Sequence, residues 1–247
     1  MKAMVLAAGL GTRLRPLTND KPKALVGIGG RTLLEITLTR LQECGIREVI
    51  VNVHHFADEV IDYLKAHGNF GMRVEVSREE ALLDTGGGLK KAGWFFLENP
   101  ADLDEPFLLH NVDVISTIDF GAMVEAHKKA GALATLAVQE RDTSRLLLFD
   151  EQMRLCGRRA RGAEPEIARQ AAKTQALAFT GIHVISPRLI GLMSEDGVFS
   201  IVNTYLRLAT QGENVQGYRA DEFYWRDLGK PESLVQAEKD YTLGLFS

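Results

Sequence analysis

The sequence has few cysteines and no metal-binding cysteine pattern. Only two cysteines, Cys44 and Cys156, occur among 247 residues. Neither belongs to a CxxC or CxxxH pattern, which disfavours a structural zinc site. We expect both to be free thiols in a reducing compartment. No Ser/His/Asp or Cys/His constellation indicates a covalent nucleophile.

Long apolar runs and an excess of positive charge are also missing. No stretch approaches the ~20 apolar residues of a membrane span, and the short apolar N-terminal run lacks a signal-peptide cleavage pattern. The net charge is −4 and the pI is about 5.9, so the chain has no general attraction for nucleic acid or anionic membranes. We therefore expect a cytoplasmic protein that binds anions through locally placed cations and backbone amides.

Apolar runs alternate with amphipathic patterns in the first half, which favours an α/β fold. Strands are expected at 3–8, 48–53, 73–77, 107–110 and 134–139. Helices are expected at 32–43 and 57–67, from near 87, and at 120–130. Repeated β–α units of this kind predict a Rossmann-like, open, mostly parallel sheet with helices on both faces.

The second half predicts a small antiparallel subregion. A hairpin is expected at 145–149 and 154–157, and a surface loop or short helix at 158–173. Further strands are expected at 176–185, 214–219 and 222–225, with helices at 199–211 and 231–243. No repeat or long linker interrupts the chain. We interpret residues 1–247 as a single domain.

The strongest chemical signal is the loop after the first strand. It reads LAAGLGTRLRPLT from residue 6 and continues to Pro22 and Lys23. In open α/β sheets, ligands bind at the carboxyl ends of the strands. Gly9 and Gly11 let the backbone approach a phosphate chain, Arg13 can hold phosphate oxygens in a bidentate manner, and Lys23 adds a compact charge. The loop lacks the Gly-Lys-Ser/Thr of a P-loop and the third glycine of a dinucleotide fingerprint.

Residues 6–25 closely resemble the signature of the sugar-1-phosphate nucleotidyltransferases. Further segments match this family in order and spacing: DTGGG at 84–88, the acidic turn at Asp113, FTGI at 179–182 and WRDLG at 225–229. The resemblance implies the nucleotide-diphospho-sugar transferase fold, with a nucleotide-binding half at 1–140 and a sugar-binding half at 141–247. It also implies a magnesium-dependent enzyme, a monomer or homodimer, whose partners are a nucleoside triphosphate and a sugar 1-phosphate.

The resemblance assigns roles to individual residues. Arg13 matches the arginine that neutralises the β- and γ-phosphates, and Lys23 matches the lysine that contacts the α-phosphate or the sugar phosphate. Asp113 and Asp227 match the two Mg²⁺ ligands. Nucleotide contacts are implied for Ala7, Ala8, Gly9, Gly11, Thr12, Asp84, Thr85, Gly86, Gly87 and Asn111. Sugar contacts are implied for Thr180, Gly181 and Trp225.

The implied chemistry suits these residue types. A sugar phosphate is already ionised at pH 7, so its attack on the α-phosphorus needs positioning and charge neutralisation rather than a strong general base. Mg²⁺ prefers hard oxygen ligands and keeps some waters, so two aspartates and phosphate oxygens suit it. Asp113 and Asp227 both follow short predicted strands, where their carboxylates can converge at one sheet edge.

One position departs from the family pattern. The family usually has glycine before the first aspartate, whereas Val112 stands there in this chain, at a position that favours an unusual backbone or a close approach to ribose. Val112 alone supports a non-catalytic subunit that senses a nucleotide sugar. A glycosyltransferase would need an Asp-x-Asp metal motif, which this turn does not supply.

The DTGGG segment most resembles that of N-acetylmuramate-1-phosphate uridylyltransferase and of mannose- or heptose-1-phosphate guanylyltransferases. The short chain fits the members without hexapeptide repeats. We expect UTP with N-acetylmuramate 1-phosphate or a related sugar as substrates, with GTP and mannose 1-phosphate as the alternative.

Overall fold

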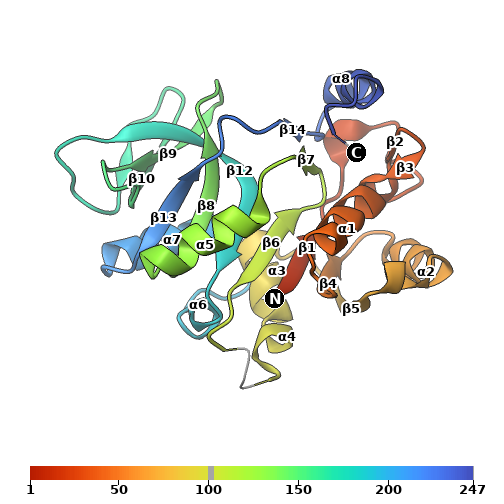
Figure 1. The fold of residues 1–247 in the computed structure, drawn as a ribbon, viewed down its shortest axis with the longest axis horizontal. Helices are drawn as coiled ribbons and strands as arrows, with labels where there is room; N and C mark the ends of the chain where they lie inside the picture. The colour runs from red at the N-terminus through yellow and green to blue at the C-terminus, as the bar shows by residue number, and fades with distance from the viewer. Residues whose placement is uncertain (100–102, 247) are drawn as a thin grey trace.

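The fold is built on a mixed sheet whose central strands run parallel. A computed structural model describes residues 1–99 and 103–246. The central strands are β1 (Lys2–Leu6), β4 (Glu48–Val53), β5 (Arg73–Arg78) and β6 (Phe107–Asn111). They pair in the order β6-β1-β4-β5, all parallel (Figure 1). The predicted α/β fold with a mostly parallel sheet is confirmed.

Antiparallel pairing extends this sheet in the second half. The long strand β12 (Gln175–Ile185) pairs antiparallel with both β6 and β8 (Ala134–Gln139), and β13 (Val215–Arg219) pairs parallel with β8. The first residues of β12 instead pair with β9 (Arg145–Phe149), which continues into β10 (Leu155–Ala160) and β11 (Glu166–Ile167). This confirms the antiparallel subregion.

The loop predicted at 158–173 is confirmed at 161–165 and 168–173, but residues 158–160 and 166–167 belong to strands. Strand β10 runs to Ala160, and β11 returns antiparallel to it, so Arg158 pairs with Glu166 in the ladder. Their side chains also form an ion pair, with 2.7 Å between Arg158 Nε and Glu166 Oε2. Strand β11 is the exposed edge of the sheet and has only two residues, and the end of β10 that pairs with it is polar, so neither shows the apolar alternation by which a half-buried strand is detected.

Helices cover both faces of the sheet. One face packs against α1 (Leu33–Glu43), α2 (Ala57–Ala66) and α5 (Phe120–Ala130). The other packs against α3 (Asp84–Ala92), α4 (Trp94–Leu97), α6 (Arg188–Gly191) and α7 (Ile201–Thr210). Successive residues of β1 alternate between the two cores: Val5 joins the first and Met4 the second. Such alternation is expected of a strand buried on both faces.

Short elements border the carboxyl edge of the sheet. They are the 3-10 turns η1 (Thr12–Leu14) and η2 (Lys23–Leu25), the pair β2 (Gly27–Ile28) and β3 (Arg31–Thr32), and the pair β7 (Val114–Ser116) and β14 (Trp225–Asp227). A third turn, η3 (Gly68–Gly71), follows α2. The closing helix α8 (Pro231–Thr242) packs against β2 and β14, away from the sheet (Figure 1). No helix in the described ranges is long and apolar enough to cross a membrane.

Among the described helices, side-chain caps mark the starts of α1, α5 and α7. Thr32 accepts a hydrogen bond from the Glu35 amide at 3.0 Å, so α1 begins where the sequence predicts. Helix α3 begins at Asp84, three residues before the predicted start near Gly87. Three consecutive glycines weaken the helical signal there, and tertiary packing outweighs their low propensity.

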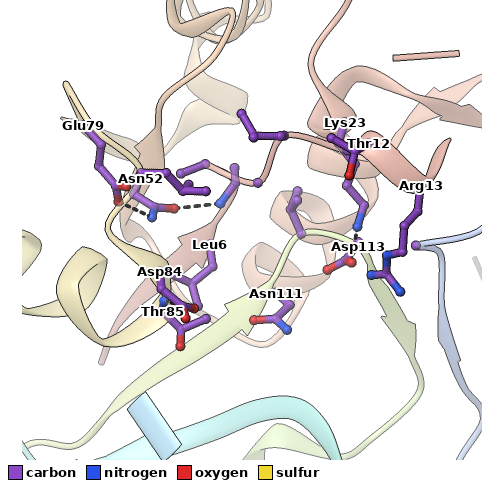
Figure 2. Close-up of a pocket in the computed structure, with 18 of the residues that line it drawn as sticks. Leu6, Thr12, Arg13, Lys23, Asn52, Glu79, Asp84, Thr85, Asn111 and Asp113 are labelled. Carbon is purple, nitrogen blue, oxygen red and sulfur yellow. Dashed lines mark hydrogen bonds and ion pairs between the residues drawn. The ribbon is translucent and has the colours of Figure 1, made fainter. Parts of the chain in front are cut away.

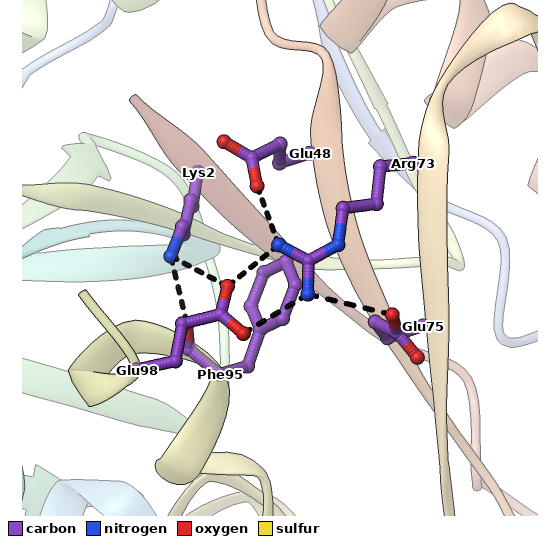
Figure 3. Close-up of polar contacts among 6 residues, drawn as sticks. All are labelled: Lys2, Glu48, Arg73, Glu75, Phe95 and Glu98. Carbon is purple, nitrogen blue, oxygen red and sulfur yellow. Dashed lines mark hydrogen bonds and ion pairs between the residues drawn. The ribbon is translucent and has the colours of Figure 1, made fainter.

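A charged cluster fixes α4 to the amino-terminal edge of the sheet. Glu98 accepts two hydrogen bonds from Arg73, at 2.7 and 2.9 Å, and one from Lys2 at 2.9 Å (Figure 3). Lys2 also donates to the Phe95 carbonyl, and Arg73 also binds Glu48. The hydrogen bonds from Arg73, and secondarily from Lys2, lower the pKa of Glu98 to about 2.

We predict that Glu98→Gln lowers the melting temperature at pH 7 by about 2 °C, the scale of a partly exposed ion pair in a chain of this size. The folded-state pKa is below the ordinary 4.5, so the contribution is present above pH 4.5 and is lost as pH falls towards 2. Thermal melts of both proteins between pH 2 and 7 measure this. Glu80→Gln, at an exposed residue, is the control, and a constant difference across the range would contradict the prediction.

Candidate active site

A cavity of about 500 Å³ opens at the carboxyl edge of the parallel strands, a size that suits a small-molecule ligand. Figure 2 shows Arg13, Lys23 and Asp113 together at one end, Asn52, Glu79, Asp84 and Thr85 at the other, and Asn111 between them. The lining residues are Leu6, Ala7, Ala8, Gly9, Leu10, Gly11, Thr12, Arg13, Lys23, Asn52, Glu79, Leu82, Asp84, Thr85, Asn111, Val112, Asp113, Val198 and Gly229.

The first loop is held in shape by Gly11. This residue has a φ of +64°, and a Cβ there would lie 3.0 Å from Cγ2 of Thr18, so glycine is required on both counts. Thr18 donates a hydrogen bond from Oγ1 to the Gly11 carbonyl at 2.8 Å. The tightened loop then turns into η1, which places Arg13 beside the cavity.

Lys23 and Asp113 form an ion pair at the cavity wall. The Lys23 ammonium contacts the Asp113 carboxylate directly, and only 10% and 17% of their side chains are exposed. Lys23 comes from η2 and Asp113 from the turn between β6 and β7, 90 residues later. Because both groups are largely removed from water, each neutralises the other at a site that would otherwise be costly to charge.

Asp227 and Arg13 lie on either side of Gly229. The Gly229 amide donates to Asp227 Oδ1 at 2.7 Å, and a Cβ at Gly229 would lie 2.6 Å from Arg13 Nη2 and 2.7 Å from Asp227 Oδ1. Strand β14 pairs with β7, and the Leu228 amide donates to the Asp113 carbonyl at 2.8 Å. The structure therefore brings together the four charged residues that the sequence singled out.

The carboxylates of this corner are too few to form a metal site alone. Within the described ranges, no three His, Cys, Asp or Glu side chains come close enough together to hold a metal ion. Two carboxylates on paired strands leave most positions around Mg²⁺ to waters and substrate phosphates, which is the usual arrangement for this ion. The donor set fits Mg²⁺ on that condition.

Two buried polar residues at the other end were missed by the sequence analysis. Asn52 accepts a hydrogen bond from the Ala7 amide at 2.7 Å and donates one to Glu79 at 2.7 Å. Glu79 in turn accepts one from the Leu83 amide at 3.0 Å. The pair thus links the first loop to the start of α3. Asn52 is a polar residue between apolar residues of β4, and this pattern could have identified it from the sequence.

The glycines of the DTGGG segment serve packing rather than the cavity. Asp84 and Thr85 line the cavity, but Gly86 and Gly87, expected to contact the nucleotide, do not. Both glycine amides donate to the Phe199 carbonyl, and a Cβ at Gly86 would lie 2.4 Å from the Phe199 ring. The helix start therefore has fewer free amides for a base than we expected, because the Phe199 carbonyl, just before α7, accepts them.

The residues expected on the sugar side do not line this cavity. Thr180, Gly181 and Trp225 are not among the lining residues. The Thr180 side chain is buried and donates to the Ala137 carbonyl at 2.8 Å. Gly181 has a φ of +82°, and a Cβ there would lie 2.6 Å from Asn111 Nδ2, so it makes room for that cavity residue. Trp225 Nε1 donates to the Thr180 carbonyl at 2.8 Å.

Val112 has an ordinary backbone. It is absent from the described residues with positive φ, its side chain is 3% exposed within the core, and its amide donates to the Leu6 carbonyl at 3.1 Å. The one observation that favoured a non-catalytic subunit thus has a packing explanation.

The neighbouring histidines cannot act as general bases at the cavity. His110 and His183 are buried and hydrogen bond to the Asn111 carbonyl and the Tyr205 hydroxyl, respectively. Burial lowers the pKa of His110 to about 4 and that of His183 to about 3, so both are neutral at pH 7.

Two cations facing two carboxylates at the carboxyl edge of a parallel sheet define an enzyme that transfers groups between phosphates. The family model "Nucleotidyl transferase" matches residues 2–146 of this chain. The chain belongs to this family, and it is an enzyme of the sugar-1-phosphate nucleotidyltransferase type.

Curated relatives agree with this assignment. N-acetylmuramate alpha-1-phosphate uridylyltransferase of Caulobacter vibrioides is 35% identical, over 96% of this chain and 95% of that protein. Mannose-1-phosphate guanyltransferase of Debaryomyces hansenii is 27% identical over 99% of this chain, which spans 66% of that protein. A solved UDP-glucose pyrophosphorylase bound to UDP-glucose has a TM-score of 0.77 at 18% identity, covering 98% of both chains. It confirms the fold.

We predict that Gly229→Ala reduces kcat/KM about 10- to 100-fold with little change in melting temperature. The added methyl group meets the flexible end of Arg13 and the Asp227 carboxylate, so it displaces the charged groups rather than the core, and small misplacements of such groups are costly. Pyrophosphate release and thermal melts measure the two effects. Gly191→Ala, where a Cβ meets nothing within 4 Å, is the control. Full activity of Gly229→Ala would contradict the geometry.

Proposed function

We propose that this enzyme transfers a uridylyl group from UTP to N-acetylmuramate 1-phosphate or a closely related sugar 1-phosphate. The observation that carries the proposal is the 35% identity to an N-acetylmuramate alpha-1-phosphate uridylyltransferase over almost the full length of both chains. The guanyltransferase relative is less similar and longer, so GTP with mannose 1-phosphate is the second candidate.

The charged corner, made of Arg13, Lys23, Asp113 and Asp227, would hold the triphosphate. Arg13 lies in the first loop beside the cavity, where its guanidinium can bind the β- and γ-phosphates. Lys23 is more deeply buried in the cavity wall, where its ammonium can reach the α-phosphate. A triphosphate also offers Lys23 an alternative to Asp113 as its partner. The opposite end, lined by Leu82, Asp84, Thr85 and Val198, then receives the base.

The reaction needs no general base. An oxygen of the sugar phosphate forms a bond to the α-phosphorus, and the bond from that phosphorus to the bridging oxygen of the β-phosphate breaks, releasing pyrophosphate. The nucleophile is already an anion at pH 7, and the neutral, buried His110 and His183 take no part. Arg13 and Lys23 lower the barrier by neutralising the repulsion between the two anions and the charge on the leaving group.

Asp113 and Asp227 are the residues that would hold Mg²⁺. When bound, the ion would supply positive charge to the phosphate oxygens and orient them. Asp227 is already oriented by the Gly229 amide, and Asp113 by the strand pair β7–β14. Release of Asp113 from Lys23 would make its carboxylate available as a ligand.

We predict that UTP with N-acetylmuramate 1-phosphate gives a kcat/KM at least about tenfold above every other pair in a screen. The screen measures pyrophosphate release from UTP, GTP, CTP, ATP and dTTP. The acceptors are the 1-phosphates of N-acetylmuramate, N-acetylglucosamine, glucose and mannose. A tenfold preference corresponds to ~1.4 kcal/mol of differential transition-state binding. Highest activity with GTP and mannose 1-phosphate would replace the first proposal with the second.

We predict that Asp227→Asn reduces kcat/KM about 10²- to 10³-fold and raises the Mg²⁺ concentration needed for half-maximal rate. Asparagine keeps an oxygen that can accept from the Gly229 amide, so the loss reports the missing charge rather than a collapsed turn. Pyrophosphate release across a MgCl₂ titration measures both quantities. Asp196→Asn, at a largely exposed carboxylate, is the control, and an unchanged Mg²⁺ requirement would rule out Asp227 as a ligand.

A further inference from the structure

Arg141, in the second half of the chain, is a half-buried cation that forms no ion pair with a carboxylate of residues 1–99 or 103–246. Its guanidinium carbon lies 3.7 Å from the centroid of the Trp225 ring, and its Nη2 donates to the Phe179 carbonyl at 2.6 Å. Its Nε is buried and has no hydrogen-bond partner among the described residues. Burial lowers the pKa of Arg141, and the negative charge of Asp227 opposes that shift.

Two other partly buried arginines of this half are paired with carboxylates, whereas the contacts of Arg169 among the described residues are to the Ala209 and Glu213 carbonyls. Arg207 binds Glu195 through two nitrogens, and Arg226 binds Asp240. The acidic neighbours of Arg141 in the sequence are also engaged elsewhere: Glu140 with Arg219 and Asp142 with Arg161. A partly desolvated guanidinium without an anion is costly to fold around, so the missing anion is expected to come from outside the chain.

The position of Arg141 connects it with the active site. Trp225 and Asp227 are two residues apart on β14 and therefore face the same side of that strand. Asp227 lies beside Gly229 and Arg13, and Arg141 stacks on Trp225. Arg13, Asp227, Trp225 and Arg141 thus form a row that leads from the triphosphate end towards the sugar-binding half.

Arg141 is also held rigidly. The Trp225 indole on which it stacks is fixed by the hydrogen bond to the Thr180 carbonyl, and the guanidinium itself is tied to the adjacent Phe179 carbonyl. A planar fork held in this way binds a carboxylate with little further loss of side-chain entropy.

We propose that Arg141 binds a carboxylate of the acceptor sugar, and that the acceptor is accordingly a sugar acid 1-phosphate. The inference rests on the proposed function, and it takes the acceptor to lie beside Trp225, where the family resemblance implies a sugar contact. Arg13 and Lys23 already provide cations for the phosphates, so a third cation farther along the row fits a second anionic group. N-acetylmuramate carries such a group on its lactyl ether, and N-acetylglucosamine is the same sugar without it.

The test compares these two acceptors in wild type, Arg141→Met and Arg141→Lys. With N-acetylmuramate 1-phosphate, Arg141→Met should lower kcat/KM about 10- to 100-fold, mainly through KM, as for loss of a charge-assisted hydrogen bond. With N-acetylglucosamine 1-phosphate, the change should stay below about twofold. Arg141→Lys should recover part of the loss. Arg159→Met, at an exposed arginine, should change neither acceptor.

Equal losses with both acceptors would overturn the inference, because Arg141 would then hold the 1-phosphate or only support Trp225. No loss with either would overturn it as well. Inactivity of wild type with both acceptors would refute the proposed function instead. The carboxylate inference is then tested with glucuronate 1-phosphate against glucose 1-phosphate and each nucleoside triphosphate, where it requires the same selective loss.

Discussion

The pairing of Lys23 with Asp113 is the interaction on which the charged corner depends. A site for polyphosphate needs cations, and a site for Mg²⁺ needs carboxylates, yet either set alone would be expensive to bury. Because Lys23 and Asp113 neutralise each other at the cavity wall, the folded chain can keep both the cations and the carboxylates in place. In the proposed function, a triphosphate would replace Asp113 as the partner of Lys23, and a metal ion would replace Lys23 as the partner of Asp113, so both charges would stay neutralised.

The sheet explains why residues so far apart in sequence meet. Parallel strands end at one edge, so the turn after β1 and the turn after β6 are neighbours, and the β7–β14 pair adds Asp227 from the far end of the chain. Asn52 and Glu79 link two segments at this edge. Asn52 binds the Ala7 amide, Glu79 binds the Leu83 amide, and the two side chains bind each other. The first loop is therefore connected through this buried pair to α3, the helix beside the end of the cavity that is proposed to receive the base. A Cβ at Gly88 would lie 2.8 Å from both side chains, so that helix can approach only with glycine there.

Much of this was predictable from the sequence where the signal was local. The buried strands, the Thr32 cap and the loop from Ala7 to Lys23 each carry their signature in consecutive residues, and the structure agrees with them. The positions of Gly86, Gly87 and Thr180 were not predictable in this way. Their surroundings are made by Phe199 and Ala137, which are distant in sequence, so a motif could name these residues without revealing which face they present. The edge strand β11 was missed because it has only two residues, both exposed, which is too short for a periodic pattern.

Arg141 illustrates the same limit from the other side. No motif singles it out, since an arginine between Glu140 and Asp142 reads as one of many surface charges. Its surroundings are visible only in the structure. Glu140 and Asp142 form ion pairs with other arginines, and Arg141 stacks on Trp225. In the proposed function, Arg13 and Lys23 bind phosphate groups, which every substrate pair of this reaction carries. Discrimination among acceptors must then come from residues farther along the row, where an unmatched cation distinguishes an acidic sugar from a neutral one.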